Sequence, residues 1–318
     1  MKIAILGAGL AGLAAARRLA AAGLTPALFD KGRAAGGRLA TRRAGSFAFD
    51  HGAQYLKPQA GSFADALHAA GAEPWPVTGG VVGVPGMSAL PRALAAGLDL
   101  QAGRQVVALR PVGGGWEVQH VDSRPPRGGV AEASRADGPF DAVICCLPAP
   151  QAAPVLAGPA PDLAAQAAAV PFRACWTLMA AFPSRLGLPD TLQAPSEAIG
   201  WACRDSAKPG RLAEAECWVV QAGPAWTESR LELAAEAARD LLLDAFGHVA
   251  TRLPAPAHAE AHRWRFAAAA RPLGLPCLWD GGLRVGVAGD WCLGDRADDA
   301  WASGEAVAQA LLADLGHG

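Results

Sequence analysis

The stretch KIAILGAGLAGLAAARRLAAAG, residues 2–23, decides the fold. Its first eight residues are a short apolar run that ends in glycines, which is typical of a buried parallel strand. Ala and Leu dominate residues 10–22 and Gly23 follows, so we expect a helix there with a glycine terminator. The run TPALFD, residues 25–30, supplies a second strand. These residues predict a βαβ start and an α/β fold.

Three glycines in this stretch have the spacing of a dinucleotide-binding turn. Gly7 permits a tight turn, Gly9 lets the backbone approach a pyrophosphate, and Gly12 lets helix and strand pack closely. The start of the helix adds N–H groups and partial positive charge for phosphates. Asp30 stands at the end of the second strand, where a carboxylate accepts hydrogen bonds from ribose hydroxyls. The spacing therefore predicts a dinucleotide site.

The basic run after the second strand bears on which dinucleotide binds. A carboxylate repels the 2′-phosphate of NADP, so Asp30 disfavours NADP, whereas Arg33 keeps that alternative open. Gly36 and Gly37 can bring backbone N–H groups close to a ligand, and Arg38 can reach a phosphate or ribityl oxygen. The run therefore favours FAD.

Composition argues against several classes of protein. The 318 residues carry 28 Lys and Arg against 29 Asp and Glu, so no general field attracts nucleic acid. The sequence has no uninterrupted apolar window long enough to predict a membrane span. A signal peptide is disfavoured because glycines interrupt the first apolar run and Arg17 and Arg18 follow it. We expect a cytoplasmic protein without nucleic-acid or membrane partners.

Metal and disulfide sites are not expected. The seven cysteines are odd in number, form no CxxC pair and mostly lie in apolar runs, where thiols act as small buried hydrophobes. His258 and His262 have helical i,i+4 spacing, but Pro254 and Pro256 favour a strand. On a strand the two histidines are about 13 Å apart, so we predict no metal.

The middle of the chain alternates helices and strands. Residues 88–97 predict a helix capped by Ser88, and residues 104–121 predict a hairpin that turns at 113–115. A polar loop is expected over 123–139, before a buried strand at 140–148.

The last half predicts strands rich in Trp and one long helix. The strands are expected at 173–182, 197–204, 216–223 and 261–269. The helix is expected over 227–247, with Ser229 and Glu232 as a capping box and Gly247 as its stop. Residues 281–315 predict a strand, a Gly-Asp loop and a terminal helix.

Two motifs together resemble the FAD-binding domain of the glutathione reductase and amine oxidase class of flavoproteins. The first is strand–GxGxxG–helix–strand–acid followed by GGR, and the second is VGVAGDWCLGDRADDAWASGEAVAQAL, residues 285–311. The resemblance implies that Asp290 approaches the ribityl-phosphate and that a helix N-terminus around Ala300 and Trp301 faces the flavin pyrimidine. Such a helix end suits a ring that gains negative charge on hydride transfer.

Three further stretches, FAFDHGAQYL, HRWRFA and GDWCLGDRADDAWASG, resemble the renalase family. The resemblance implies an FAD-dependent oxidase that takes a hydride from 2- or 6-dihydro isomers of NAD(P)H. It passes the electrons to oxygen, giving NAD(P)+ and hydrogen peroxide.

The same resemblance implies the architecture and domain division. It is a Rossmann-like FAD-binding domain with a parallel sheet plus a mixed-sheet α+β substrate domain of the hydroxybenzoate-hydroxylase type. We expect the FAD-binding domain over 1–57, 88–160 and 270–318, and the substrate domain over 58–87 and 161–269.

The residues expected along FAD combine the fingerprint with the resemblance, which places the backbone of Val107 at the adenine. They are Gly7, Gly9, Ala11, Gly12, Asp30, Lys31, Gly37, Arg38, Gln54, Tyr55, Val107, Asp290, Ala300 and Trp301. After Tyr55 the chain reads LKPQ, where the family has an aromatic and a small polar residue, so the substrate stays open. The candidates for lining a substrate pocket are Tyr55, Lys57, His262 and Trp264.

No residue is assigned as a catalytic base, because a dihydropyridine expels hydride with help from its own nitrogen lone pair. One alternative is a flavin amine oxidase or desaturase, and amine oxidases often place a lysine over the flavin. Of the four lysines, only Lys57 and Lys208 suit that position. The other alternative is a non-catalytic FAD-binding protein.

Overall fold

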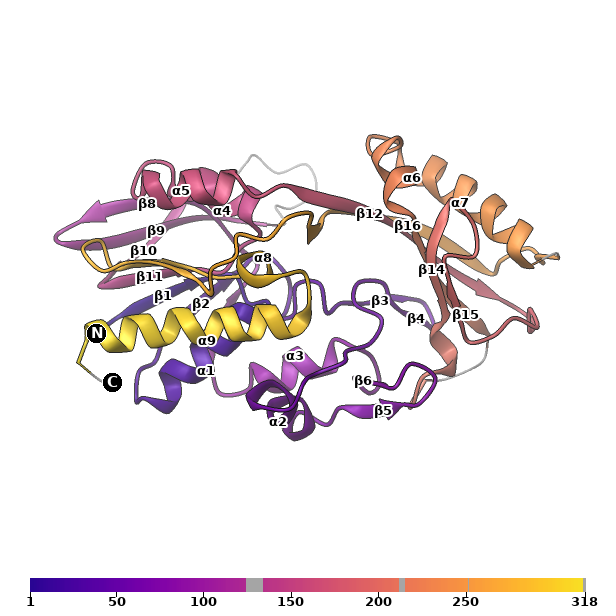
Figure 1. Ribbon diagram of the computed structural model, residues 1–318, viewed down its shortest axis with the longest axis horizontal. Coiled ribbons are helices and arrows are strands. Elements are labelled where there is room, and N and C mark those ends of the chain that lie inside the picture. Colours follow the sequence, from indigo (N-terminus) through magenta and orange to yellow (C-terminus); the bar gives the residue numbers. More distant parts are fainter. Residues whose placement is uncertain (124–133, 212–214, 251, 317–318) are drawn as a thin grey trace. The chain divides into compact units, whose positions relative to one another are not determined.

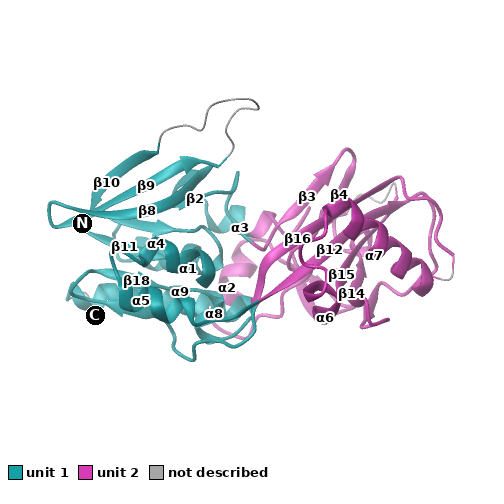
Figure 2. Cartoon of the chain, turned by 90° about the horizontal axis from the view of Figure 1, so that it is seen from above, with its two compact units in different colours: residues 1–37, 91–172, 269–318 teal, residues 38–90, 173–268 magenta. Residues whose placement is uncertain are grey.

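The computed structural model describes residues 1–123, 134–211, 215–250 and 252–316. Figure 1 shows the elements in chain order and Figure 2 the two compact units into which they fall. Unit 1 comprises residues 1–37, 91–172 and 269–318, and unit 2 comprises residues 38–90 and 173–268.

Unit 1 is built on a six-stranded sheet in the order β17-β18-β11-β1-β2-β7. Its strands are β1 (Ile3–Leu6), β2 (Ala27–Asp30), β7 (Asp99–Ala102), β11 (Ala142–Cys145), β17 (Leu278–Asp280) and β18 (Val285–Val287). Neighbouring strands are parallel except for β17, which runs antiparallel to β18. Every residue of β1, β11 and β18 is buried, as expected for parallel strands covered on both faces.

Helices and a small meander complete unit 1. Helices α1 (Leu10–Ala21) and α9 (Ala297–Asp314) lie side by side (Figure 1), and a Cβ on Gly304 would stand 2.1 Å from the Ala11 carbonyl oxygen. The glycine therefore permits their close approach. The remaining elements are β8 (Arg104–Val112), β9 (Gly115–Asp122), β10 (Arg135–Phe140), α4 (Ala149–Leu156), α5 (Pro161–Ala168) and α8 (Asp290–Leu293).

Unit 2 centres on a five-stranded sheet in the order β13-β14-β15-β12-β16. Its strands are β12 (Phe172–Phe182), β13 (Thr191–Gln193), β14 (Ile199–Arg204), β15 (Glu216–Ala222) and β16 (His258–Ala269). The pairs β13–β14, β14–β15 and β15–β12 are antiparallel. The other elements of unit 2 are β3 (Thr41–Ala44), β4 (Phe47–Asp50), α2 (Ser62–Ala69), β5 (Glu73–Trp75), β6 (Gly80–Val82), η1 (Asp205–Ala207), α6 (Pro224–Glu228) and α7 (Ala235–Ala250). Helix α3 (Ala89–Leu94) spans the boundary at residue 90.

The two faces of this sheet have separate cores because side chains alternate along each strand. On one face, Leu178 and Ala180 of β12 share a core with Leu242 and Phe246 of α7. On the other face, Met179 and its neighbours pack with β4; this core comprises Phe49, Met179, Ala181, Cys217 and Val219. Strand β4, which leads into the segment HGAQY at residues 51–55, is thus held against the sheet.

The predicted helix over 227–247 is wrong at both ends. Helix α7 begins at Ala235 and continues through Gly247 to Ala250. Ser229 is not its cap, because its hydroxyl donates to the carbonyls of Ala225 and Trp226 in α6. The Glu232 carboxylate accepts hydrogen bonds from Arg263 and Arg265 instead. The ion pairs of Glu232 with two arginines of β16 therefore take the place of the predicted capping box.

The predicted loop at 123–139 and the predicted domain bounds also differ from the structure. Strand β10 occupies Arg135–Phe140 because it pairs with β9, and residues 124–133 lie outside the described residues. Residues 38–57 fall in unit 2, where Phe49 joins the sheet core. Residues 161–172 fall in unit 1, where Leu163 and Ala167 of α5 pack with α4.

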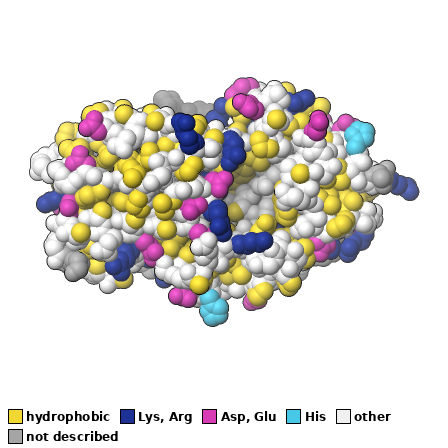
Figure 3. Space-filling view, in the orientation of Figure 1, with side chains coloured by type: hydrophobic (Ala, Val, Ile, Leu, Met, Phe, Trp, Pro, Cys, Tyr) yellow, Lys and Arg dark blue, Asp and Glu magenta, His cyan; other side chains and the backbone are white. Residues whose placement is uncertain are grey.

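Two general properties bear on partners. On the face shown in Figure 3, Lys and Arg side chains are interspersed with Asp and Glu, in keeping with a net charge of −1. Among the helices that the structure describes, none has the length and apolarity needed to traverse a bilayer.

Candidate functional site

The glycines of the first turn have distinct roles in unit 1. A Cβ on Gly12 would lie 1.9 Å from the Gly7 carbonyl oxygen, so this position requires glycine for packing. Gly7 has φ +102°, and a Cβ there would lie 2.8 Å from the Cys146 carbonyl oxygen. By contrast, a Cβ on Gly9 would meet no described atom within 4 Å. Packing therefore does not require a glycine at position 9. The open space beside Gly9 is available to a ligand.

A second pair of glycines lies against this turn. The Gly36 N–H donates to the Ala8 carbonyl oxygen at 2.8 Å, and a Cβ on Gly37 would lie 3.6 Å from the Gly9 Cα. Gly37 has φ +54°, a conformation that glycine adopts without strain. We call Gly9, Gly36 and Gly37 the glycine cradle. It presents bare backbone at the start of α1, where N–H groups and the helix dipole favour phosphate.

Asp30 holds the same turn from the end of β2. Its Oδ2 accepts the Ala8 N–H at 2.7 Å and its Oδ1 accepts the Gly32 N–H at 2.6 Å. A carboxylate has about four lone-pair sites, so acceptor capacity remains for ribose hydroxyls. The neighbouring Lys31 contributes its carbonyl oxygen, which accepts from the Ser123 hydroxyl. Asp30 is therefore both part of the turn and a candidate ribose ligand.

Val107 lies at an irregularity in β8. The register with β9 shifts between Val106 and Ala108, so Val107 is the extra residue of a β-bulge, and it is 41% exposed. The extra residue of a bulge is left out of the ladder of strand hydrogen bonds. Its backbone is thus suited to the predicted contact with adenine.

The C-terminal motif places Asp290 in a buried turn. Asp290 begins α8 and is 3% exposed, and the preceding Gly289 N–H donates to the Ser303 hydroxyl at 3.0 Å. Helix α9 begins at Ala297, three residues before the predicted position. The Ala300 N–H donates to the Arg296 carbonyl oxygen at 3.2 Å.

This geometry corrects the expected flavin-facing backbone. A helix leaves only its first-turn N–H groups without an internal partner, so these groups belong to 297–299 and not to Ala300 or Trp301. Trp301 is 5% exposed and serves the packing of α9. Asp298 and Asp299 already complement the helix dipole in this first turn.

In unit 2, the segment HGAQY is held by hydrogen bonds from several elements. The Ala53 N–H donates to the Arg38 carbonyl oxygen, and the Gly52 carbonyl oxygen accepts from Gln221 of β15. The Arg38 guanidinium donates to the Ala267 carbonyl oxygen at 2.8 Å, so it is partly committed to β16. The Gln54 Oε1 accepts from the Cys203 thiol at 2.7 Å.

Next to this segment lies a group of aromatic and imidazole rings. The centroids of His262 and Trp264 are 4.5 Å apart, and the His51 ring lies 5.0 Å from each of them. The Trp264 Nε1 donates to the His51 carbonyl oxygen at 2.9 Å. Strand β16 thus brings both predicted pocket residues to His51, which the sequence did not single out.

Both imidazoles of this group are neutral near pH 7. Burial lowers the pKa of His51 to about 3, with further lowering from His262 and Arg42. Burial and the Arg42 charge lower the pKa of His262 to about 4. The Arg42 guanidinium lies 3.5 Å from His262 Nδ1, so it donates to that nitrogen. These histidines shape the site without adding positive charge.

Tyr55 and Lys57 lie in a second aromatic group. The Tyr55 ring lies 6.1 Å from Trp75 and 5.8 Å from Trp201, measured between ring centroids. The Lys57 ammonium stands 5.6 Å from the centre of the Tyr55 ring. We call Gln54, Tyr55, Trp75 and Trp201 the Tyr55 cluster.

The other lysine considered for the flavin position is buried in an ion network. Lys208 Nζ lies 3.1 Å from Asp50 Oδ2 and 2.5 Å from Asp205 Oδ1, and all three side chains are fully buried. Arg211 adds a 2.5 Å contact to Asp50 Oδ2. Burial alone would lower the pKa of Lys208, but the Asp205 and Asp50 carboxylates raise it above its ordinary value. Sequence reasoning missed this network because Asp50 lies 158 positions from Lys208 in the sequence.

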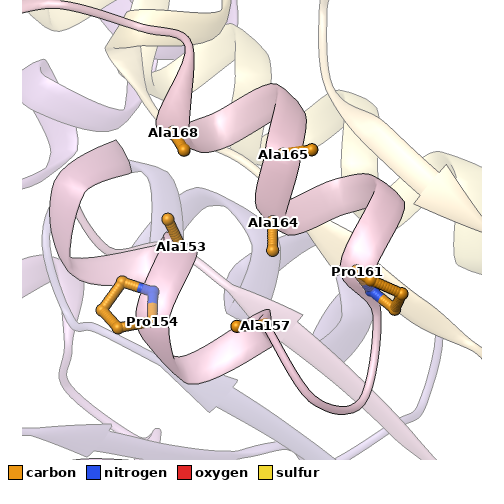
Figure 4. Close-up of a pocket in the computed structure, with 7 residues that line it drawn as sticks. All are labelled: Ala153, Pro154, Ala157, Pro161, Ala164, Ala165 and Ala168. Atoms are coloured by element: carbon orange, nitrogen blue, oxygen red, sulfur yellow. The ribbon is translucent and has the colours of Figure 1, made fainter.

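Other features do not form a catalytic site. The described residues contain no group of three or more His, Cys, Asp or Glu side chains able to hold a metal. Strand β16 contains both His258 and His262, as predicted. A groove of about 380 Å³ between α4 and α5 is lined only by Ala and Pro (Figure 4), so it offers no polar side chain for catalysis.

The cradle, the ribose carboxylate and the bulged strand define a dinucleotide-binding α/β protein, and these residues fit FAD. A family model for the NAD(P)-binding Rossmann-like domain matches residues 5–68. The model for flavin containing amine oxidoreductase matches residues 76–312. The chain belongs to this flavin-containing amine oxidoreductase family, and it is an FAD-dependent oxidoreductase.

Two solved structures share the fold over nearly the whole chain. The putative protoporphyrinogen oxidase from Exiguobacterium sp. 255-15 is 13% identical with a TM-score of 0.69, covering 99% of each chain. A wild-type putrescine oxidase bound to putrescine is 14% identical with a TM-score of 0.69, covering 98% of this chain and 99% of that one. At these identities the likeness concerns the Rossmann-like α/β fold.

Proposed function

We propose that the protein oxidises 2- and 6-dihydro isomers of NAD(P)H, giving NAD(P)+ and, with oxygen as acceptor, hydrogen peroxide. The observation that carries this proposal is the commitment of Lys208 to two buried carboxylates. With Lys208 held by these carboxylates, an amine oxidase that uses a lysine at the flavin would have to use Lys57 instead. A dihydropyridine needs no such group, because its own nitrogen assists hydride loss.

The residues that would hold FAD follow from unit 1. The glycine cradle would take the pyrophosphate, Asp30 the adenosine ribose and the Val107 backbone the adenine. Asp290 would approach the ribityl-phosphate side. Bound FAD supplies a two-electron acceptor that oxygen can reoxidise.

The side chains of unit 2 would bind and orient the substrate. His51 and His262 are neutral imidazoles packed on Trp264, so they offer ring surfaces and hydrogen bonds without a strong base. Such a site contributes by holding a reactive C–H in position, which is sufficient for hydride transfer from an activated donor.

Two alternatives remain candidates. A flavin amine oxidase or desaturase with another substrate is favoured by the family match, and Lys57 is the lysine outside the buried ion network that sequence reasoning considered. A non-catalytic FAD-binding protein would use the same cradle.

Anaerobic mixing tests all three. The purified FAD holoenzyme is mixed with the 2- and 6-dihydro isomers, with fresh NADH and with putrescine, while flavin absorbance near 450 nm is followed. Rapid loss with the isomers and slow loss with NADH would support the proposal. Rapid loss with the amine alone would favour the amine oxidase, and no loss with any reductant would favour a binding protein.

A further inference from the structure

Three buried nitrogen donors of the Tyr55 cluster have no hydrogen-bond partner in the described part of the chain. They are the Gln54 Nε2, the Trp75 Nε1 and the Trp201 Nε1. Gln54 is 5% exposed and Trp75 is 2% exposed. A buried donor without an acceptor costs free energy, and native proteins contain only a few. Three within one cluster point to an acceptor that the protein itself does not supply.

Strand β14 supplies Trp201, the HGAQY segment supplies Gln54 and Tyr55, and β5 supplies Trp75, whose ring meets Tyr55. Trp201 and Cys203 are two residues apart on β14, so their side chains share one face of the strand. Cys203 contacts Gln54 and Trp201 contacts Tyr55, which aligns the segment with that face. Burial raises the pKa of Cys203 to about 12, so the protonated thiol donates to the Gln54 Oε1. The amide of Gln54 is thereby oriented with its oxygen already used.

The charges around the cluster select the kind of ligand. Lys208 Nζ lies 5.5 Å from the Trp75 ring, and Lys57 Nζ lies 5.6 Å from the Tyr55 ring. Lys208 is paired with Asp50 and Asp205, and Lys57 is exposed to solvent. An ammonium ligand cannot accept a hydrogen bond, so it would leave the N–H donors of the cluster without a partner. A carbonyl oxygen on a planar ring would meet donors and aromatic surfaces.

We propose that the Tyr55 cluster is a subsite for a planar aromatic amide or other ring-bound carbonyl, and that it discriminates against cationic amines. This inference rests on the proposed function, because it assigns the carboxamide of a dihydronicotinamide to these donors. A flavin carbonyl could accept the same hydrogen bonds as the carboxamide oxygen. The experiment must therefore distinguish binding of the substrate from binding of the cofactor.

The test uses two probes that share a ring, benzamide and benzylamine, titrated calorimetrically into the FAD holoenzyme. Benzamide should bind at least about tenfold more tightly than the benzylammonium ion, because only benzamide accepts hydrogen bonds. Equal binding, or tighter binding of benzylamine, would overturn the proposal.

Trp201→Phe removes one unpartnered N–H and keeps an aromatic ring. Trp176→Phe is its matched control in unit 2, since the Trp176 Nε1 donates to the Arg230 carbonyl oxygen at 3.0 Å. Trp201→Phe should weaken benzamide binding by about tenfold and change the Tm little. Trp176→Phe should lower the Tm by several degrees and leave benzamide binding unchanged.

Two outcomes for Trp201→Phe would contradict the assignment. A fall in Tm like that of the control, with unchanged benzamide binding, would show that a structural water satisfies the indole. Loss of FAD retention with unchanged benzamide binding would assign the donor to the cofactor. If benzamide binds as expected but dihydronicotinamide isomers leave the flavin oxidised, the subsite stands and the proposed function fails.

Gln54→Glu gives a second measurement. The carboxylate can still accept from the Cys203 thiol, but it replaces the unpartnered donor with an acceptor. The preference should therefore shift from benzamide toward benzylamine by about tenfold or more. An unchanged preference would contradict a role for Gln54 in selection.

Discussion

The ammonium nitrogen of Lys208 lies 3.1 Å from Asp50 Oδ2, although the two residues are 158 positions apart. Asp50 also accepts from the Thr41 hydroxyl at 2.7 Å and from the Met87 N–H at 2.9 Å. This carboxylate therefore joins both segments of unit 2. It immediately precedes HGAQY, so the ion network fixes the start of the segment that carries Gln54 and Tyr55.

Removing Lys208 should destabilise the protein strongly. Lys208→Met leaves the buried carboxylates of Asp50 and Asp205 without their ammonium partner, which costs about 3–5 kcal/mol of unfolding free energy. Urea unfolding of the holoenzyme measures the loss. Lys57→Met, at an exposed lysine, is the control and should change stability by less than about 0.5 kcal/mol. Equal stability of the two variants would refute the structural role of the network.

Gly9→Ala and Gly12→Ala should separate ligand binding from packing. A Cβ on Gly9 meets no described atom, so Gly9→Ala should fold normally but lose most of its bound FAD, because the methyl group occupies the cradle. A Cβ on Gly12 would lie 1.9 Å from the Gly7 carbonyl oxygen, so Gly12→Ala should lose stability or fail to fold. Far-UV circular dichroism and the flavin-to-protein absorbance ratio distinguish these effects. If Gly9→Ala retained its full flavin content, the glycine cradle could not be the binding site of the pyrophosphate.

Asp30→Ala should lower FAD occupancy by removing a ribose acceptor. The substitution also releases the Ala8 and Gly32 N–H groups, which shape the turn. We expect at least about tenfold weaker FAD binding, the effect of losing one charge-assisted hydrogen bond. Asp280→Ala is a matched control in unit 1, since its Oδ1 also accepts a backbone N–H, from Leu283. Asp30→Ala that retains all its flavin would rule out the ribose assignment.

Acid should weaken the fold through His51 and His262. Their pKa values in the folded chain, about 3 and about 4, lie below the ordinary 6.5, so the unfolded chain binds more protons. Stability is fully present above pH 6.5 and falls as the pH drops toward 4, by at most about 1.4 kcal/mol per pH unit for each histidine.

Urea midpoints measured between pH 7 and 5 test this dependence. His51→Leu should flatten the dependence by removing one titrating imidazole. His248→Leu should not, because the His248 side chain is 81% exposed. A pH dependence that is the same in His51→Leu and the wild type would show that His51 is protonated equally in the folded and unfolded chain.

The sequence predicted the parts of the fold that depend on local pattern. The βαβ start at residues 2–30, the hairpin at 104–121 and the long strand β16 all depend on glycine placement and apolar periodicity, and the structure contains them. The helix expected over 227–247 failed because a capping motif is weak beside the ion pairs that Glu232 makes with Arg263 and Arg265.

The candidate site was predictable in its glycine and carboxylate residues and less so elsewhere. Gly9 and Asp30 lie where short-range spacing places them. The Lys208–Asp50 ion pair and the contact of His51 with His262 join residues more than 150 positions apart, and no spacing rule links such residues. The shift of the α9 start to Ala297 shows that the motif located the helix but not its first turn.

The close packing of α1 against α9, with Gly304 against Ala11, sets the order in which the protein can mature. During synthesis the glycine cradle is translated before unit 2, whereas α9, which packs on α1, is translated after it. Strand β18, the partner of β11, also follows unit 2 in the sequence. The sheet of unit 1 can therefore be completed only after residues 38–90 and 173–268, which form unit 2, have been translated.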